Sequence, residues 1–175
     1  MSILVIAEHD NNSLKGATLN TVTAATSLTG DVAILVAGSN IDPVVTECQT
    51  LDNVSKILKC DSETYVNAIA EELSSLVLAN CDGYTHILAP ATTFGKNLMP
   101  RISAKLDSQQ ISDIISIESD DTFKRPIYAG SCIATVKSND SVKVITVRST
   151  AFDAITQNNS NVDVHEINDE GSSNI

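Results

Sequence analysis

Short apolar runs separated by polar turns predict the architecture of the first half of the chain. We predict strands at residues 3–7, 32–37, 54–58 and 85–89. Apolar residues recur near helical spacing between and after these runs, and we predict helices over residues 15–29, 42–51, 61–78 and 95–106. This alternation of strands and helices is typical of a parallel sheet that is covered by helices on both faces.

The period changes after residue 111. We predict short strands at residues 114–117, 122–128, 132–137 and 143–148. The last two alternate apolar and polar residues, and Ser138-Asn-Asp-Ser141 between them predicts a hairpin loop. We therefore expect antiparallel strands at one edge of the sheet. The predicted fold class is α/β, a three-layer α/β/α sandwich with a mainly parallel sheet and antiparallel edge strands.

The chain becomes polar from residue 157 onward. One brief apolar alternation at residues 162–167 is followed by acidic residues, asparagine, glycine and serine. That composition is typical of a linker. We predict one domain over residues 1–156 and a polar linker over residues 157–175.

Composition and charge exclude several classes of protein. The 175 residues carry a formal net charge of -11, so we expect no nucleic-acid partner, because phosphate binding needs a basic face. No apolar run is long enough to cross a membrane, and the chain opens on a strand, not on a signal peptide. We expect a soluble intracellular protein. The four cysteines, which lack zinc-site spacing, are interpreted as reduced, buried or half-buried thiols and not as a disulfide framework.

The turn after the strand at 85–89 is one place where the chain could bind an anion. Gly95 and Lys96 follow that strand and open a helix, a setting in which backbone N–H groups favour a phosphate. The alternative interpretation is that Gly95 permits a tight turn and Lys96 is solvated, because the motifs GxGxxG and GxxxxGK[ST] are both missing.

Other candidate residues are cations at strand ends and one histidine. Arg101, Arg125 and Arg148 are the arginines of the chain, and each could bind a partner or form an internal salt bridge. The candidate internal partners are Asp113, Asp120, Asp121 and Asp153. His86 is interpreted as a hydrogen-bonded structural residue and not as a catalyst. No catalytic triad or metal site can be placed from spacing.

Four segments carry a resemblance to a known family. They are Phe94-Gly-Lys-Asn-Leu-Met-Pro-Arg101, Ile111-Ser-Asp113, Thr122-Phe-Lys-Arg-Pro-Ile-Tyr-Ala-Gly130 and Thr146-Val-Arg-Ser-Thr-Ala-Phe-Asp153. In order and spacing they resemble the electron transfer flavoprotein alpha subunit, and the chain looks like its N-terminal domain. The resemblance implies an adenine-nucleotide-hydrolase-like sandwich.

The resemblance also implies a function for the whole protein. Members of the family are heterodimers of an alpha and a beta subunit, with one FAD and, in the beta subunit, one AMP. They carry electrons from flavin dehydrogenases, such as acyl-CoA dehydrogenases, to a membrane-bound quinone oxidoreductase. On this basis the chain is an electron carrier subunit and not an enzyme, located in the bacterial cytoplasm or in the mitochondrial matrix.

One departure limits what this chain can do alone. The family's FAD domain follows this segment, and its glycine-rich Val-Val-Ser-Gly-Gly-Arg-Gly stretch is not in the sequence. We therefore expect no FAD site and no redox activity in this chain. The resemblance also implies that the turn with Thr92, Gly95, Lys96 and Asn97 is a relic of the loop that helps to bind AMP in the beta subunit, and we expect this nucleotide-type loop to be empty or filled by side chains. The predicted interface with the beta subunit consists of Arg101, Asp113, Arg125, Tyr128 and Arg148. The alternative function is a stand-alone nucleotide-binding α/β domain that uses the helix N-terminus at Gly95.

Overall fold

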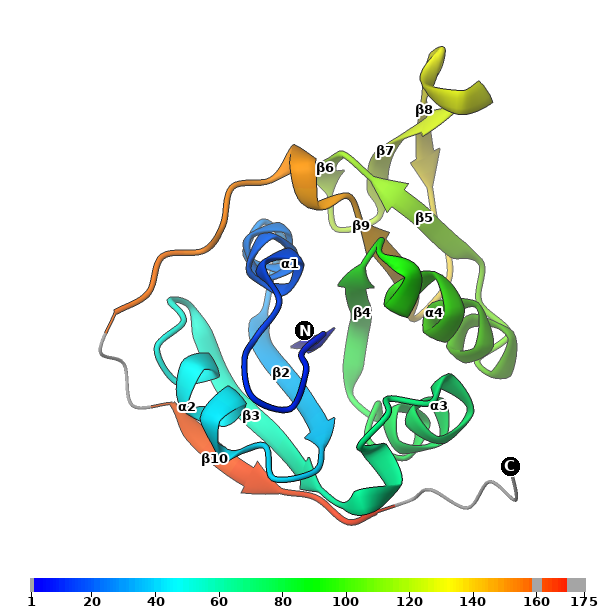
Figure 1. The fold of residues 1–175 in the computed structure, drawn as a ribbon. Helices are drawn as coiled ribbons and strands as arrows, with labels where there is room; N and C mark the ends of the chain where they lie inside the picture. Colours follow the sequence, from blue (N-terminus) through cyan, green and yellow to red (C-terminus); the bar gives the residue numbers. More distant parts are fainter. Residues whose placement is uncertain (1, 159–161, 170–175) are drawn as a thin grey trace.

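A seven-stranded parallel sheet forms the centre of the molecule (Figure 1). The computed structural model describes residues 2–158 and 162–169. In spatial order the strands are β10 (Asp163–Glu166), β3 (Val54–Asp61), β2 (Asp31–Gly38), β1 (Ser2–Ile6), β4 (Tyr84–Pro90), β9 (Lys143–Val147) and β5 (Gln110–Ile114). Each neighbouring pair in this order is parallel.

Four helices cover the two faces of this sheet. They are α1 (Gly16–Thr26), α2 (Asp42–Cys48), α3 (Ala70–Ala79) and α4 (Thr93–Lys105). One apolar cluster joins α1 and α2 to one face, and a second cluster joins α3 and α4 to the other. Successive side chains of a strand point to opposite faces, so Ile3 belongs to the first cluster and Leu4 to the second. The predicted three-layer α/β fold is confirmed.

A smaller antiparallel sheet projects from one end of the molecule (Figure 1). It consists of β6 (Ser116–Ser119), β7 (Thr122–Ile127) and β8 (Cys132–Lys137), with a short 3-10 turn, η2 (Tyr128–Gly130), at its far end. We call residues 116–137 the arm. Its base is fixed to the body by Phe123, which is fully buried in the first apolar cluster.

The strand predicted at residues 143–148 is present, but the prediction of its pairing and of its place in the sheet is wrong. Strand β8 pairs with β7, so residues 138–141 form no hairpin with β9. Strand β9 lies inside the large sheet, parallel to both β4 and β5. Its alternating pattern was misleading because the polar Thr146 is only 1% exposed. The Thr146 hydroxyl accepts a hydrogen bond from the Asp113 N–H at 2.8 Å, which satisfies it inside the sheet.

The predicted helix over residues 61–78 is wrong in its first part. Asp61 ends β3, and its carboxylate accepts hydrogen bonds from the N–H groups of Asn40 and Ile41 at 2.7 and 3.2 Å. A 3-10 turn, η1 (Glu63–Tyr65), follows, and α3 begins only at Ala70. Ala68 has a φ of 47°, which an α-helix does not accommodate.

Part of the predicted linker is docked on the body. Strand β10 pairs with β3, and Val162 before it is buried. After β10, the Asp169 carboxylate accepts hydrogen bonds from three hydroxyl groups. The donors are Ser62 at 2.5 Å, Thr64 at 2.7 Å and Tyr65 at 2.8 Å. Residues 159–161 and 170–175 of the predicted linker lie outside the described residues, and the division after residue 156 stays a prediction.

Candidate functional site

The predicted nucleotide-type loop lies at the carboxyl end of β4, where α/β folds usually bind ligands. Thr92 is the N-cap residue of α4, and Gly95 is in its first turn. A Cβ atom on Gly95 would lie only 2.0 Å from the Pro90 carbonyl oxygen. Glycine therefore lets the helix approach the strand end closely. Lys96 and Asn97 are exposed, and Asn97 accepts a hydrogen bond from Arg101.

A carboxylate of the same chain lies beside the N-cap residue of α4. Glu8 follows β1, and its Oε2 accepts a hydrogen bond from the Thr92 hydroxyl at 2.8 Å. The Glu8 N–H donates to the Thr18 hydroxyl, which fixes this residue to α1. Because a helix N-terminus favours negative charge, Glu8 lies where a phosphate would otherwise be stabilised.

Further side chains fill the adjacent ends of β1 and β2. Asn11 accepts a hydrogen bond from the Ser39 N–H at 3.2 Å and donates to the Val66 carbonyl at 2.9 Å. A Cβ on Gly38 would lie 2.2 Å from the Asn11 amide oxygen. His9 accepts a hydrogen bond from the Asn11 N–H, and burial lowers the pKa of His9. We call this region, with Glu8, His9, Asn11 and Thr92, the closed edge.

Apart from Thr92, the residues of the closed edge were not among the candidate site residues predicted from the sequence. A usable signal was present, because a glutamate and a histidine directly after a buried strand of a parallel sheet must lie at its carboxyl edge.

Three of the predicted interface residues meet at the carboxyl ends of β5 and β9. The Arg148 Nε lies 3.1 Å from both carboxylate oxygens of Asp113, and its Nη2 also contacts Oδ2. The Arg125 Nε donates to the Ser112 carbonyl at 2.8 Å. The two arginines therefore approach two consecutive residues from different strands. We call Ser112, Asp113, Arg125 and Arg148 the arginine site.

An irregularity in β5 creates this arrangement. The register between β5 and β9 shifts between Ile111 and Ile114, and Asp113 has a φ of 61°. Left-handed geometry at an aspartate is uncommon and often marks a functional position. The hydrogen bonds to Asp113 raise the pKa of Arg148. Of the four aspartates proposed as internal partners of the arginines, Asp113 is the one that pairs with Arg148, whose side chain stays 42% exposed.

The other two predicted interface residues lie apart from the arginine site. Arg101 forms a 2.5 Å ion pair with Glu71, which places it between α4 and α3. Tyr128 lies at the tip of the arm and is 79% exposed. Ile133, across the tip on β8, is 62% exposed. The arm tip thus presents apolar side chains to solvent.

His86 has the structural role that was predicted for it. It is 1% exposed, its Nε2 donates to the Asp120 carbonyl at 2.7 Å, and its Nδ1 lies 2.9 Å from the Thr85 hydroxyl. Burial lowers the pKa of His86. The Asp120 carboxylate accepts from the Thr29 N–H at 2.8 Å, so this histidine helps to join the base of the arm to the body.

The cysteines differ from one another in exposure. None of the four is part of a disulfide bond, as predicted, and Cys48, Cys60 and Cys81 are buried. Burial raises the pKa of Cys48 to about 12. Cys132 at the arm tip is exposed, in contrast to the predicted burial.

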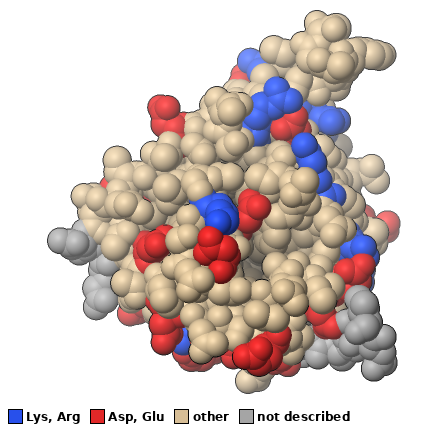
Figure 2. All heavy atoms as spheres, in the orientation of Figure 1, with Lys and Arg blue, Asp and Glu red and all other residues tan. Residues whose placement is uncertain are grey.

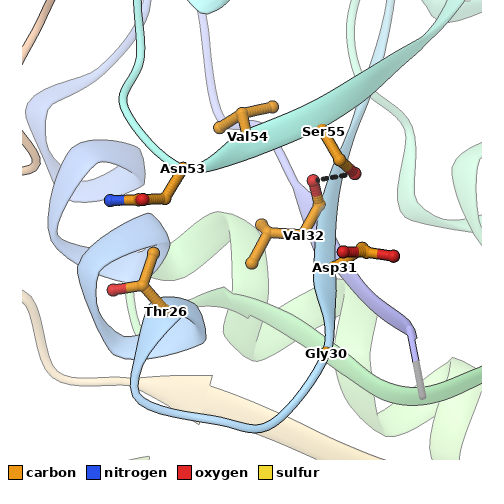
Figure 3. Close-up of a pocket in the computed structure, with 7 residues that line it drawn as sticks. All are labelled: Thr26, Gly30, Asp31, Val32, Asn53, Val54 and Ser55. Atoms are coloured by element: carbon orange, nitrogen blue, oxygen red, sulfur yellow. Dashed lines mark hydrogen bonds between the residues drawn. The ribbon is translucent and has the colours of Figure 1, made fainter.

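An open pocket of about 540 Å³ lies at the opposite, amino-terminal edge of the sheet (Figure 3). It is lined by Thr26, Gly30, Asp31, Val32, Asn53, Val54 and Ser55. The Ser55 hydroxyl donates to the Val32 carbonyl at 2.9 Å. Asp31 is the charged residue of this lining, and it is exposed. The pocket contains none of the predicted site residues and lacks the apolar lining that is typical of ligand pockets.

Within the described parts of the chain, no group of three or more His, Cys, Asp or Glu side chains could hold a metal ion. No helix in those parts is long and apolar enough to cross a membrane.

Comparison with known proteins identifies a family. The sequence matches the electron transfer flavoprotein domain over residues 3–171. It is 49% identical to the electron transfer flavoprotein subunit alpha of Pseudomonas aeruginosa over 167 residues, which cover 95% of this chain and 54% of that protein. It is 43% identical to the mitochondrial electron transfer flavoprotein subunit alpha of Dictyostelium discoideum over 174 residues, covering 95% and 49%. The chain therefore spans about half the length of the curated relatives that it matches.

Proposed function

The chain belongs to the electron transfer flavoprotein domain family, and from this premise we propose that it is the N-terminal scaffold and subunit-interface domain of an alpha subunit. The extended similarity to relatives named as alpha subunits supports this proposal. The whole protein would be a heterodimer with a beta subunit and one FAD. It would carry electrons from flavin dehydrogenases to a quinone oxidoreductase, in a bacterial cytoplasm or a mitochondrial matrix.

The described residues do not fit a flavin dinucleotide. At the carboxyl edge, Glu8 already binds the Thr92 hydroxyl and Asn11 already binds the Ser39 N–H. At the amino-terminal edge, the charged residue of the pocket is Asp31, which would repel a pyrophosphate. We therefore propose that the FAD is held outside residues 2–158 and 162–169, that AMP is bound by the beta subunit, and that this chain alone is not redox active.

The exposed arm tip is the observation that carries the interface part of the proposal. Tyr128 and Ile133 are mostly exposed, although nearly all other large apolar side chains are buried or half-buried. Aromatic and aliphatic side chains that stand on a projecting element are typical of protein interfaces. We propose that the beta subunit covers this tip and the adjacent arginine site. Arg101 stays a predicted interface residue, but it lies apart from the others.

The test is binding of the cognate beta subunit to the chain, measured by titration calorimetry and native mass spectrometry. We expect a one-to-one complex, and we expect the double variant Tyr128→Ser, Ile133→Ser to lose it without a change in melting temperature. The matched control is Val66→Ser, because Val66 is 40% exposed outside the arm. Absence of a complex, also when the C-terminal half of an alpha subunit is fused to the chain, would contradict the proposed function.

A further inference from the structure

Arg125 differs from the other cations of the arm because no carboxylate of the described residues pairs with it. The arm carries three cations, and two of them pair within it. The Lys124 Nζ lies 3.1 Å from the Glu118 Oε2, and the Lys137 Nζ lies 3.1 Å from the Asp121 Oδ2. Among residues 2–158 and 162–169, no carboxylate pairs with Arg125, and its contact to the Ser112 carbonyl uses only Nε. Its two terminal nitrogens thus remain free to donate.

The guanidinium group of Arg125 is held in place before any partner arrives. Its backbone is fixed by pairing with Ala134 in the arm, and its Nε is fixed by Ser112 in β5. The neighbouring Arg148 is already neutralised by Asp113. The arginine site therefore carries one excess positive charge, on a chain whose formal net charge is -11. A positioned guanidinium loses little side-chain entropy on binding, and its planar fork matches a carboxylate.

The surroundings of the site favour a protein carboxylate as the ligand. In Figure 2, most basic side chains on the visible face gather towards the arm, and acidic side chains dominate the opposite end. The exposed Tyr128 is three residues from Arg125 on the same projecting element. A partner that buries the tip would also remove water from the free nitrogens, which costs binding energy unless the partner supplies an acceptor.

We infer that a carboxylate side chain of the beta subunit binds the terminal nitrogens of Arg125, beside the Asp113–Arg148 pair. This inference rests on the proposed function, because it names the chemistry by which that partner is recognised. The two lysines of the arm, Lys124 and Lys137, already form ion pairs within it. Arg125 is thus the position at which charge can decide the affinity and the orientation of the partner.

The test compares Arg125→Gln with Lys15→Gln in binding to the cognate beta subunit. Lys15 is the control because it is a surface cation outside the arm and outside the predicted interface, and it already pairs with Asp10. We expect Arg125→Gln to weaken binding by about 30-fold or more, and Lys15→Gln by less than about threefold. Wild-type binding should also weaken between about 0.05 and 0.3 M salt, with a smaller change for Arg125→Gln.

Two further variants separate recognition from folding. Arg125→Lys keeps the charge but loses the fork, so we expect an intermediate affinity at an unchanged melting temperature. Arg125→Glu should abolish binding, and replacing one acidic residue of the beta subunit with arginine should restore it. If the wild type binds the beta subunit and Arg125→Gln binds it equally well, this inference is overturned and the proposed function is not. No binding by the wild type, also when the C-terminal half of an alpha subunit is fused to it, would instead overturn the proposed function.

Discussion

The closed edge and the arginine site lie at the same carboxyl edge of one parallel sheet, but their polar groups are used differently. At the ends of β1 and β4, the Glu8 carboxylate accepts a hydrogen bond from the Thr92 hydroxyl, beside the N-terminus of α4. At the ends of β5 and β9, Asp113 neutralises Arg148, and Arg125 keeps donors that no described residue uses. The position at the end of a parallel strand therefore does not identify a binding site by itself. We propose that the donors left over after internal pairing mark the binding site.

The largest expected effect concerns the packing of the closed edge. Gly95→Ala should destabilise the chain by about 3 kcal/mol, because its Cβ would meet a backbone carbonyl, which cannot move like a flexible side chain. The control is Gly16→Ala at the start of α1, where a Cβ meets nothing within 4 Å, and where alanine should be neutral or slightly stabilising. Urea denaturation measures both. A harmless Gly95→Ala would mean that the closed edge is loose enough to admit a ligand.

A smaller effect is expected for the ion pair of the arginine site. Arg148→Ala should lower the free energy of unfolding by about 1 kcal/mol or less, because half-exposed ion pairs contribute little. Its effect on beta-subunit binding should be larger than its effect on folding. A double-mutant cycle with Asp113→Asn measures the coupling, since asparagine tolerates the left-handed backbone at this position. A loss well above 2 kcal/mol would make the pair mainly a structural element.

The next effect concerns the connection between the body and the arm. Burial lowers the pKa of His86, so the unfolded chain binds this proton at a higher pH than the folded chain does. The contribution of the neutral His86 to the free energy of unfolding is therefore fully present above about pH 6.5. It is lost as the pH falls below that value. Urea midpoints between about pH 7.5 and pH 5 should show this decline. His86→Gln should reduce the slope but not abolish it, because burial also lowers the pKa of His9.

The smallest effect is the absence of nucleotide binding at the closed edge. Titration with AMP or ATP at about 1 mM should give no heat, because Glu8 already supplies the negative charge at the helix N-terminus. The variant Glu8→Gln removes that charge. It should still bind AMP or ATP weakly or not at all, since His9 and Asn11 remain in place. Clear heat with the wild-type chain would favour the alternative function, a stand-alone nucleotide-binding domain.

The sequence predicted the regular part of this fold better than its edges. Continuous apolar runs correctly placed β1, β2 and β4, because a strand buried on both faces has no other pattern. Strand β9 was misplaced because Thr146 looks exposed but is satisfied by a backbone N–H from a neighbouring strand. That partner comes from an irregular β5, which leaves no clear signature in the sequence.

The candidate site was predicted in its residues but not in its pairing. Strand-end arginines pointed to the arginine site, and three of the five predicted interface residues meet there. Which aspartate pairs with Arg148 could not be decided, since that depends on the left-handed turn at Asp113. The arm also could not be predicted, because β8 has the same alternating pattern as a strand at the edge of the large sheet.

The three hydroxyl groups around Asp169 bear on how the protein should be expressed and fused. A chain cut after residue 156 would lose β10 and this anchor, and β3 would become a bare edge strand that invites aggregation. A cut after Asp169 would keep that edge covered. A domain or reporter joined there would start from a position that Ser62, Thr64 and Tyr65 hold against the body.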